Sequence, residues 1–245
     1  MNRILSLLSA LLFSIPAVAD EAKDPQVQYR VSYNSNYLAF GAGIELWDQP
    51  CVQGDISWFW KNGVYLFLWG STDLEGRPGS SLADEYDLGL GWAGVVKGWN
   101  VDIGVTYFDE PHLGKVARLG EEDILYTRLK IGHSIGRNWT MSGTFENYAT
   151  MHNTGYSGGN LYGLELAKTF SISKKVSVPF SVATIYDDGG FGFDDGVFIR
   201  GSLGADITLT KTLTLNAGGR YYLPVGVNDA RKNDVMSFIG LTWKP

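Results

Sequence analysis

Apolar and polar residues alternate with a period of two along most of the chain after residue 25. From Val27 to Tyr33, every second residue is Val or Tyr, and the residues between them are Gln, Arg and Ser. The same alternation runs from Trp99 to Tyr107 and from Leu213 to Tyr221. This period predicts β-strands with one apolar and one polar face. No stretch after residue 19 approaches the roughly eighteen apolar residues of a spanning helix.

Two kinds of connection alternate between the predicted strands. Short turns are expected at 61–63, 97–98, 136–138, 173–175 and 210–212. Longer polar segments, rich in Gly and acidic residues, are expected at 41–50, 74–84, 109–122, 150–160, 188–196 and 224–233. Short turns on one side and long loops on the other are typical of bacterial outer-membrane barrels. The sequence therefore predicts an all-β fold, a transmembrane antiparallel up-and-down β-barrel of about twelve strands.

Aromatic residues gather towards both ends of the predicted strands. Those near the short turns are Trp58, Trp60, Trp92, Trp99, Trp139, Phe170 and Trp243. Those near the long segments are Tyr33, Tyr107, Tyr148, Tyr186 and Tyr222. Aromatic side chains prefer the headgroup level of a membrane, so two girdles are expected. A secreted β-sandwich would also alternate, but it explains neither the turn pattern nor the girdles.

The first nineteen residues predict export from the cytoplasm. Arg3 precedes an apolar run from Ile4 to Ile15, and Ala17-Val18-Ala19 forms a small-residue cleavage site. This pattern is that of a secretory signal peptide. We therefore expect cleavage behind Ala19, a barrel formed by residues 20–245, and a place in the bacterial outer membrane. The sole cysteine, Cys51, excludes an intramolecular disulfide.

Composition narrows the classes of partner. The chain has 245 residues, of which 44% are hydrophobic and 19% charged, and its net charge is −6. A nucleic-acid binder with a basic surface is therefore not expected. Neither a metal-ligand spacing nor a nucleotide motif occurs, so the prediction includes no cofactor. The expected partners are small solutes together with outer-membrane lipid and lipopolysaccharide.

If the polar face of each strand points inward, charged side chains line the lumen. The inward acids would be Asp55, Glu85, Asp87, Asp102, Glu146, Glu165 and Asp206. The inward bases would be Arg30, Arg128, Lys130, Arg200 and Arg220. We interpret these bases as a basic wall and Asp55, Glu85, Asp87 and Asp102 as an acidic wall, because charged pore linings select ions. The alternative is a lattice of salt bridges that fills a narrow lumen, since twelve strands lie between filled and open barrels.

Within the basic wall, Arg30, Arg200 and Arg220 are expected on nearby strands. Like charges that close repel unless acids or a passing anion offset them. Asp206 and Glu165 are the nearest partners by strand order, and they are too few for every base.

Catalytic residues are not predicted. The histidines are His112, His133 and His152. The first and last fall in long segments, and the ring of His133 would face lipid without an acid on the same face, so a Ser-His-acid relay is disfavoured. Acidic pairs beside the loops, such as Asp187-Asp188, could form a carboxylate protease site or hold divalent cations against lipopolysaccharide phosphates, but solvated loop acids are the simpler interpretation.

A group of short motifs is clearest over residues 35–107. They are Ser35-Asn36-Tyr37, Gly41, Pro50, Val52-Gln53-Gly54, Gly63-Val64-Tyr65, Trp69-Gly70-Ser71, Glu85-Tyr86-Asp87-Leu88 and Gly91. In these motifs the chain resembles the proteobacterial TorF-like porin family. It departs from the family at Phe40-Gly41, where Arg-Gly is usual. The resemblance implies an outer-membrane barrel that passes solutes, and it supplies no ligand or catalytic residues.

The function predicted from the sequence is passive diffusion of small solutes through a porin-like channel, without enzymatic activity. The alternative is a non-transporting barrel that scaffolds partners or binds envelope components through its acidic extracellular loops. The sequence leaves open whether a loop folds into the lumen.

Overall fold

The computed structural model describes residues 25–39, 41, 43–74, 84–109, 124–136, 138–150, 158–189, 195–226 and 233–245. The predicted signal peptide lies outside these residues. The described strands are β1 (Gln26–Asn34), β2 (Tyr37–Ala39), β3 (Ile44–Trp47), β4 (Cys51–Phe59), β5 (Val64–Asp73), β6 (Glu85–Val96), β7 (Trp99–Asp109), β8 (Ile124–Ile135), β9 (Trp139–Thr150), β10 (Gly159–Ser171), β11 (Val176–Asp188), β12 (Gly196–Thr208), β13 (Leu213–Val225) and β14 (Asp234–Trp243).

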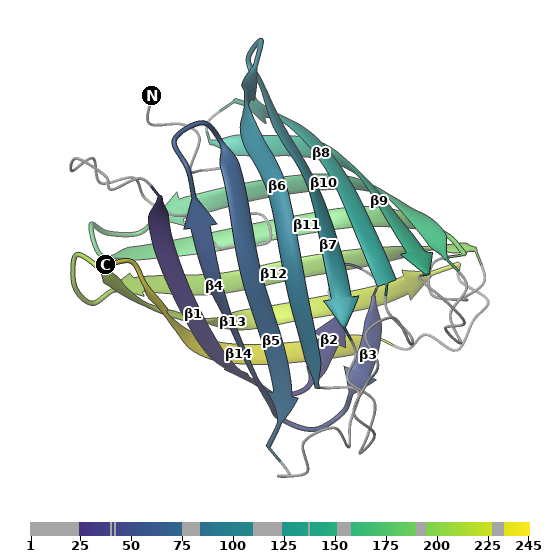
Figure 1. Cartoon of the computed structure of the whole chain (residues 1–245), viewed down its shortest axis with the longest axis horizontal. Coiled ribbons are helices and arrows are strands. Elements are labelled where there is room, and N and C mark those ends of the chain that lie inside the picture. The colour runs from purple at the N-terminus through teal and green to yellow at the C-terminus, as the bar shows by residue number, and fades with distance from the viewer. Residues whose placement is uncertain are drawn as a thin grey trace.

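Within the described residues, twelve of these strands form one closed antiparallel barrel (Figure 1). Sequential strands pair from β4 round to β14, and β1 closes the ring by pairing with both β14 and β4. Closure leaves no sheet edge with unpaired backbone groups, which is what a strand-built structure needs in a lipid environment. The predicted fold class and strand number are confirmed. The described residues contain no helix suited to crossing a bilayer.

The predicted turns are confirmed. Short connections join β4 to β5, β6 to β7, β8 to β9, β10 to β11 and β12 to β13. Three of these turns, β4–β5, β6–β7 and β8–β9, use left-handed backbone conformations, which Gly63, Lys97, Gly98, Gly136 and Asn138 supply with positive φ angles. The remaining connections are longer, and the strand ends that they join lie at the opposite end of the barrel (Figure 1).

The outer surface carries the apolar face that the alternation predicts. Large apolar side chains such as Ile103, Leu164 and Leu203 are more than half exposed. On the strands, such residues alternate with inward ones, as on β7, where Ile103 and Val105 are exposed while Asp102 and Thr106 are buried. The predicted loop-side girdle is wrong for Tyr148 and Tyr222. Both side chains are buried inside the barrel, because each occupies an inward position of its strand.

The two residues after the last strand stay attached to the barrel. Trp243 stacks on Tyr29 of β1, with 5.1 Å between the ring centroids. The backbone N–H of Lys244 donates to the carbonyl of Thr212, in the turn between β12 and β13, at 2.8 Å. The C-terminal extension beyond Trp243 therefore lies against the short-turn end of the barrel.

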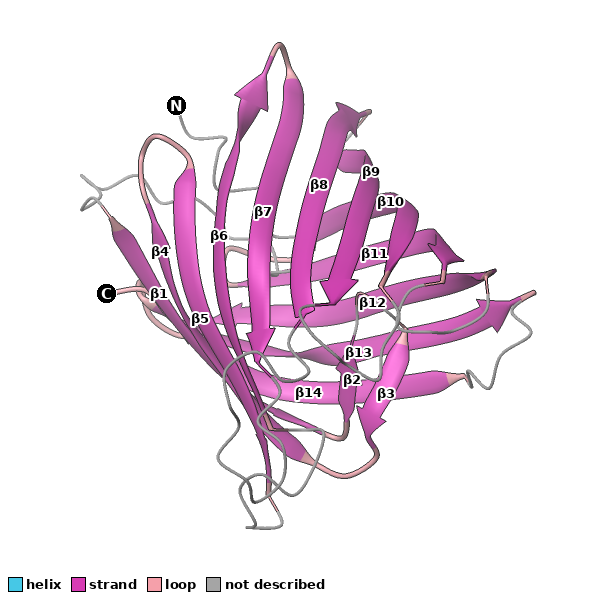
Figure 2. Ribbon diagram, turned by 45° about the vertical axis from the view of Figure 1, so that its right-hand side comes forward, coloured by secondary structure: helices cyan, strands magenta, loops and turns pink. Residues whose placement is uncertain are grey.

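The first connection of the barrel differs from the prediction. It starts directly after Asn34 rather than at residue 41, and it contains the small β2–β3 sheet. Figure 2 shows this hairpin within the outline of the barrel, at the end where the long connections emerge. The side-chain contacts of the hairpin place it inside the lumen, and so settle the question of an inward loop that the sequence left open.

Candidate functional site: the barrel lumen

Polar contacts hold the β2–β3 hairpin to the inner wall. The Tyr37 hydroxyl donates to the Glu85 carboxylate of β6, and the Asn36 side-chain amide donates to Asp234 of β14 at 3.2 Å. Across the lumen, the Arg200 guanidinium of β12 donates to the carbonyl of Gly41 at 3.4 Å. The hairpin is therefore tied to three separate strands of the barrel.

Apolar packing adds to these contacts at the long-loop end of the lumen. Leu38 is 3% exposed and belongs to a cluster of inward residues contributed by many strands. We call this group the hairpin cluster; it consists of Leu38, Ile124, Tyr148, Leu161, Ala183, Ile185, Phe198, Tyr222, Met236 and Phe238. At Gly43, with φ of +70°, a Cβ atom would lie 2.8 Å from the Tyr222 ring, so only glycine lets the hairpin backbone approach this closely.

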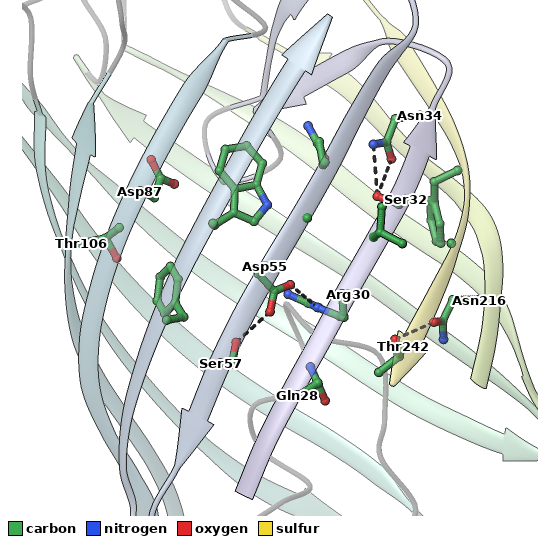
Figure 3. A pocket seen from close by; sticks show the side chains of 18 of the residues that line it. Gln28, Arg30, Ser32, Asn34, Asp55, Ser57, Asp87, Thr106, Asn216 and Thr242 are labelled. Atoms are coloured by element: carbon green, nitrogen blue, oxygen red, sulfur yellow. Dashed lines mark hydrogen bonds and ion pairs between the residues drawn. The ribbon is translucent and has the colours of Figure 1, made fainter. Parts of the chain in front are cut away.

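Towards the short turns the lumen opens into a cavity of about 370 Å³. Tyr37, Leu38 and Leu46 of the hairpin bound one end of it, and Thr208, Thr214 and Lys244 line the other. Figure 3 shows a polar part of its wall, where Gln28, Arg30 and Asp55 point inward from β1 and β4. The hairpin thus narrows the lumen at the long-loop end, and charged side chains line the cavity towards the short turns.

The charged residues that the sequence placed in the lumen have inward side chains. Ion pairs join several of them across neighbouring strands. Arg30 pairs with Asp55, which also accepts from Ser57 at 2.7 Å. Arg128 pairs with Asp102 at 2.7 Å, and Lys130 pairs with Glu165 at 2.7 Å.

These ion pairs show that the predicted basic and acidic walls are not separate. Arg30 belongs to the predicted basic wall and Asp55 to the acidic one, yet they face each other in register on β1 and β4. Arg128 and Lys130 lie on β8, between Asp102 of β7 and the acids of β9 and β10, Glu146 and Glu165. They are therefore remote in strand order from Arg200 and Arg220. The pairing of Arg30 with Asp55 and the position of Arg128 and Lys130 among acids both fit the alternative interpretation, a lattice of salt bridges.

Arg200, Arg220 and Arg30 do lie on nearby strands, β12, β13 and β1. The Arg220 guanidinium lies over the Phe238 ring at 5.6 Å, and the side chain lines the cavity. Arg200 is buried beside the hairpin. Asp206, a predicted partner of the arginines, accepts from Asn216 at 2.7 Å, and Asn216 accepts from Thr242 at the same distance.

The remaining predicted residues take the following places. Glu85 is buried under Tyr37, Asp87 lines the cavity, and Glu146 is buried and accepts from Tyr148 at 3.2 Å. Asp187, interpreted as a solvated loop acid, is fully buried at the end of β11, so that interpretation is wrong. Asp187 is buried because it occupies one of the alternate positions of β11 whose side chains point into the barrel.

His133 lies on the outside of the barrel. Its ring contacts Trp99 at 5.0 Å between centroids, and Nδ1 is 3.2 Å from the Gly98 carbonyl. His112 and His152 lie outside the described residues. Among the described part of the chain, His, Cys, Asp and Glu side chains do not gather into a metal-binding group.

Solved structures with the same arrangement are outer-membrane channels. The NanC porin superposes with a TM-score of 0.60 at 12% identity, over 89% of this chain and 100% of that one. The KdgM porin, also solved in complex with disordered oligogalacturonate, gives 0.54 at 8% identity over 89% and 98%. The COG4313 outer membrane channel from Pseudomonas putida F1 gives 0.53 at 12% identity over 95% and 100%. The chain therefore has the fold of porin-like channels.

No family model and no curated protein matches the chain. The resemblance to TorF-like porins is thus not confirmed at the level of the family, although the barrel that it implied is present. One signal for the inward hairpin was available in the sequence. At the loop ends of several strands, inward positions are apolar, as at Ile124, Leu161, Ile185 and Met236, where a water-filled pore would have polar residues.

Proposed function

We propose that this protein is an outer-membrane channel for passive diffusion of small solutes, with the β2–β3 hairpin as its constriction. The observation that carries the proposal is the combination of an apolar outer surface, a closed barrel and an inner cavity lined by charged as well as aromatic side chains. A protein that only scaffolded partners would need no polar space within the barrel. The likeness to outer-membrane channels supports the same function.

Conductance of the purified protein in a planar lipid bilayer tests this proposal. We expect discrete current steps in symmetric salt. If well-inserted protein gives no steps, the channel function is wrong and the second candidate, a non-transporting barrel, is favoured. The observation behind that candidate is the hairpin cluster, which fills the loop end of the lumen.

We also propose that both termini face the periplasm and the long connections face outward. β1 begins and β14 ends at the short-turn end (Figure 1). A small epitope inserted between residues 74 and 84 should then be labelled on intact cells. The matched insertion at Lys61-Asn62-Gly63 should be labelled only after the outer membrane is permeabilised. The reverse pattern would show the opposite orientation.

A further inference from the structure

Aromatic side chains form a column along the inner face of β5. Tyr65, Phe67 and Trp69 occupy successive inward positions, and all three line the cavity. The neighbouring strand β6 carries glycines opposite two of them, with Gly89 in register with Phe67 and Gly91 with Tyr65. A Cβ atom on either glycine would overlap the ring, so the rings cover bare backbone. The aromatic column is therefore fitted into the wall rather than projecting across the lumen.

Polar side chains stand directly beside this column. In the β4–β5 register, Asp55 faces Trp69 and Ser57 faces Phe67. In the β1–β4 register, Arg30 faces Asp55 and Gln28 faces Ser57. Side chains directly opposite each other on neighbouring strands are about 5 Å apart. Two parallel rows result, Arg30–Asp55–Trp69 and Gln28–Ser57–Phe67, and each runs from hydrogen-bonding groups to an aromatic ring. Figure 3 shows the polar members of both rows.

Gln28 contributes a buried hydrogen-bond acceptor to the wall of the cavity. The residue is only 3% exposed and lines the cavity, yet its side-chain oxygen has no hydrogen-bond partner in the described part of the chain. A buried carbonyl without a partner is costly, and a bound hydroxyl group would satisfy it.

The charge of the cavity favours a neutral occupant. The basic side chains that line it are Arg30, Arg128, Arg220 and Lys244. The acidic side chains are Asp55, Glu85, Asp87 and Asp206, equal in number among the described residues. A lining balanced in this way has no net charge with which to attract an ion, while its paired groups still offer donors and acceptors.

We propose that the two rows bind a neutral polyhydroxylated ring, a pyranose sugar unit, in the lumen. One face of a pyranose is a flat set of C–H groups, which suits the negative face of an aromatic ring. Its edge carries hydroxyl groups, which would meet Ser57, Asp55 and Gln28. The cavity volume falls at the lower end of the range of small-molecule sites, about 300–1,000 Å³. This inference rests on the proposed channel function, because the solute must enter the lumen.

Saturation-transfer NMR with methyl α-glucopyranoside and the purified protein in detergent measures this binding without any current. We expect transfer to the pyranoside, strongest at the protons of one ring face, and weaker transfer to sorbitol, which has hydroxyl groups but no ring. Phe67→Leu should weaken pyranoside binding about threefold to tenfold, the contribution of an aromatic partner. Gln28→Leu, which preserves side-chain bulk, should weaken it as well.

The matched control is Phe145→Leu, which removes an aromatic ring from the outer face and should leave binding unchanged. Equal transfer to sorbitol, stronger transfer to glucuronate, or unchanged binding in both Phe67→Leu and Gln28→Leu would each overturn the proposal. Conductance of the same preparation separates the two ideas. Binding without current would contradict the channel function alone, and current without binding would contradict the sugar site alone.

Discussion

The two ends of the lumen are built from the same strands but in opposite ways. At the long-loop end, inward positions carry apolar residues such as Ile124, Phe198 and Met236, and they enclose Leu38 of the hairpin. At the short-turn end, inward positions of the same barrel carry Ser57, Asn216 and Thr242, which surround the cavity. One end therefore resembles the core of a soluble protein, and the other resembles a pore.

This difference shows that two properties are set independently: whether a side chain points into the lumen, and whether the space there is filled by another segment. Alternation decides whether a residue points inward. Whether the inward space holds solvent or another segment depends on the chemistry of several distant strands together. The narrow part of the lumen is consequently a packing interface, stabilised by burial, with a few hydrogen bonds such as Tyr37–Glu85 and Arg200–Gly41.

Releasing the hairpin should have the largest effect. Leu38→Asp puts a carboxylate into the hairpin cluster, where burying an unpaired charge costs on the order of several kcal/mol. We expect the hairpin to leave the wall and the single-channel conductance to rise severalfold. Leu38→Met, which nearly conserves volume and should cost less than about 1.5 kcal/mol, is the control. An unchanged conductance in Leu38→Asp would mean that the hairpin does not limit the current.

Charged substitutions on the outer face, which both ends of the barrel share, should have the next largest effect. Ile103→Arg and Leu215→Arg place a charge against lipid, which costs about 2–4 kcal/mol near the bilayer midplane. Thr106→Arg, inward on the same strand as Ile103, should insert more readily. The measurement is the folded fraction in membranes, read from heat-dependent mobility on a gel. Equal insertion of all three variants would contradict the assignment of faces.

Particular residues show how much the sequence could predict. The parity of each strand gives the inward side of Arg30, Asp102 and Glu165 correctly, because alternation is a local property. Their ion-pair partners depend on register between strands, which turns and closure set together, so the Arg30–Asp55 and Lys130–Glu165 pairs were not predictable. The girdle prediction for Tyr222 is wrong, although the alternation from Leu213 to Tyr221, continued by one residue, places the Tyr222 side chain inside the barrel.

The β2–β3 hairpin could not be predicted from the alternation of residues, for a different reason. Its strands are three and four residues long, too short for a periodic signal. Its position depends on contacts with strands far away in sequence, such as β12 and β14. The apolar inward residues near the long loops were the only local trace of it in the residues that the structure describes.

Arg220 and Arg200, both members of the predicted basic wall, have different surroundings in the lumen, so their substitutions should have different effects. Arg220 lines the open cavity, so Arg220→Gln should shift the reversal potential in a salt gradient towards cation selectivity, most clearly at low salt. Arg200 instead holds the hairpin through Gly41, so Arg200→Gln should change conductance more than selectivity. If the two variants shift the reversal potential equally, both arginines act as one wall.

The smallest expected effect concerns Lys244, at the short-turn end of the cavity. Burial and the nearby Arg30 lower the pKa of this amine to about 8, against a smaller opposing effect of Asp206. Its ammonium form is therefore less favoured in the folded protein than in the unfolded chain. Between about pH 8 and the ordinary lysine value, the unfolded chain binds more protons than the folded one, so this group adds stability as the pH rises.

The same titration should be visible in the current. Between pH 7 and pH 9, Lys244 changes from mostly charged to mostly neutral, while Arg30 keeps its charge. The short-turn end of the cavity then loses one positive charge, and the reversal potential should move modestly towards cations. Lys244→Met should show the pH 9 selectivity already at pH 7 and lose this pH response. A response that persists in Lys244→Met would place the titrating group elsewhere in the protein.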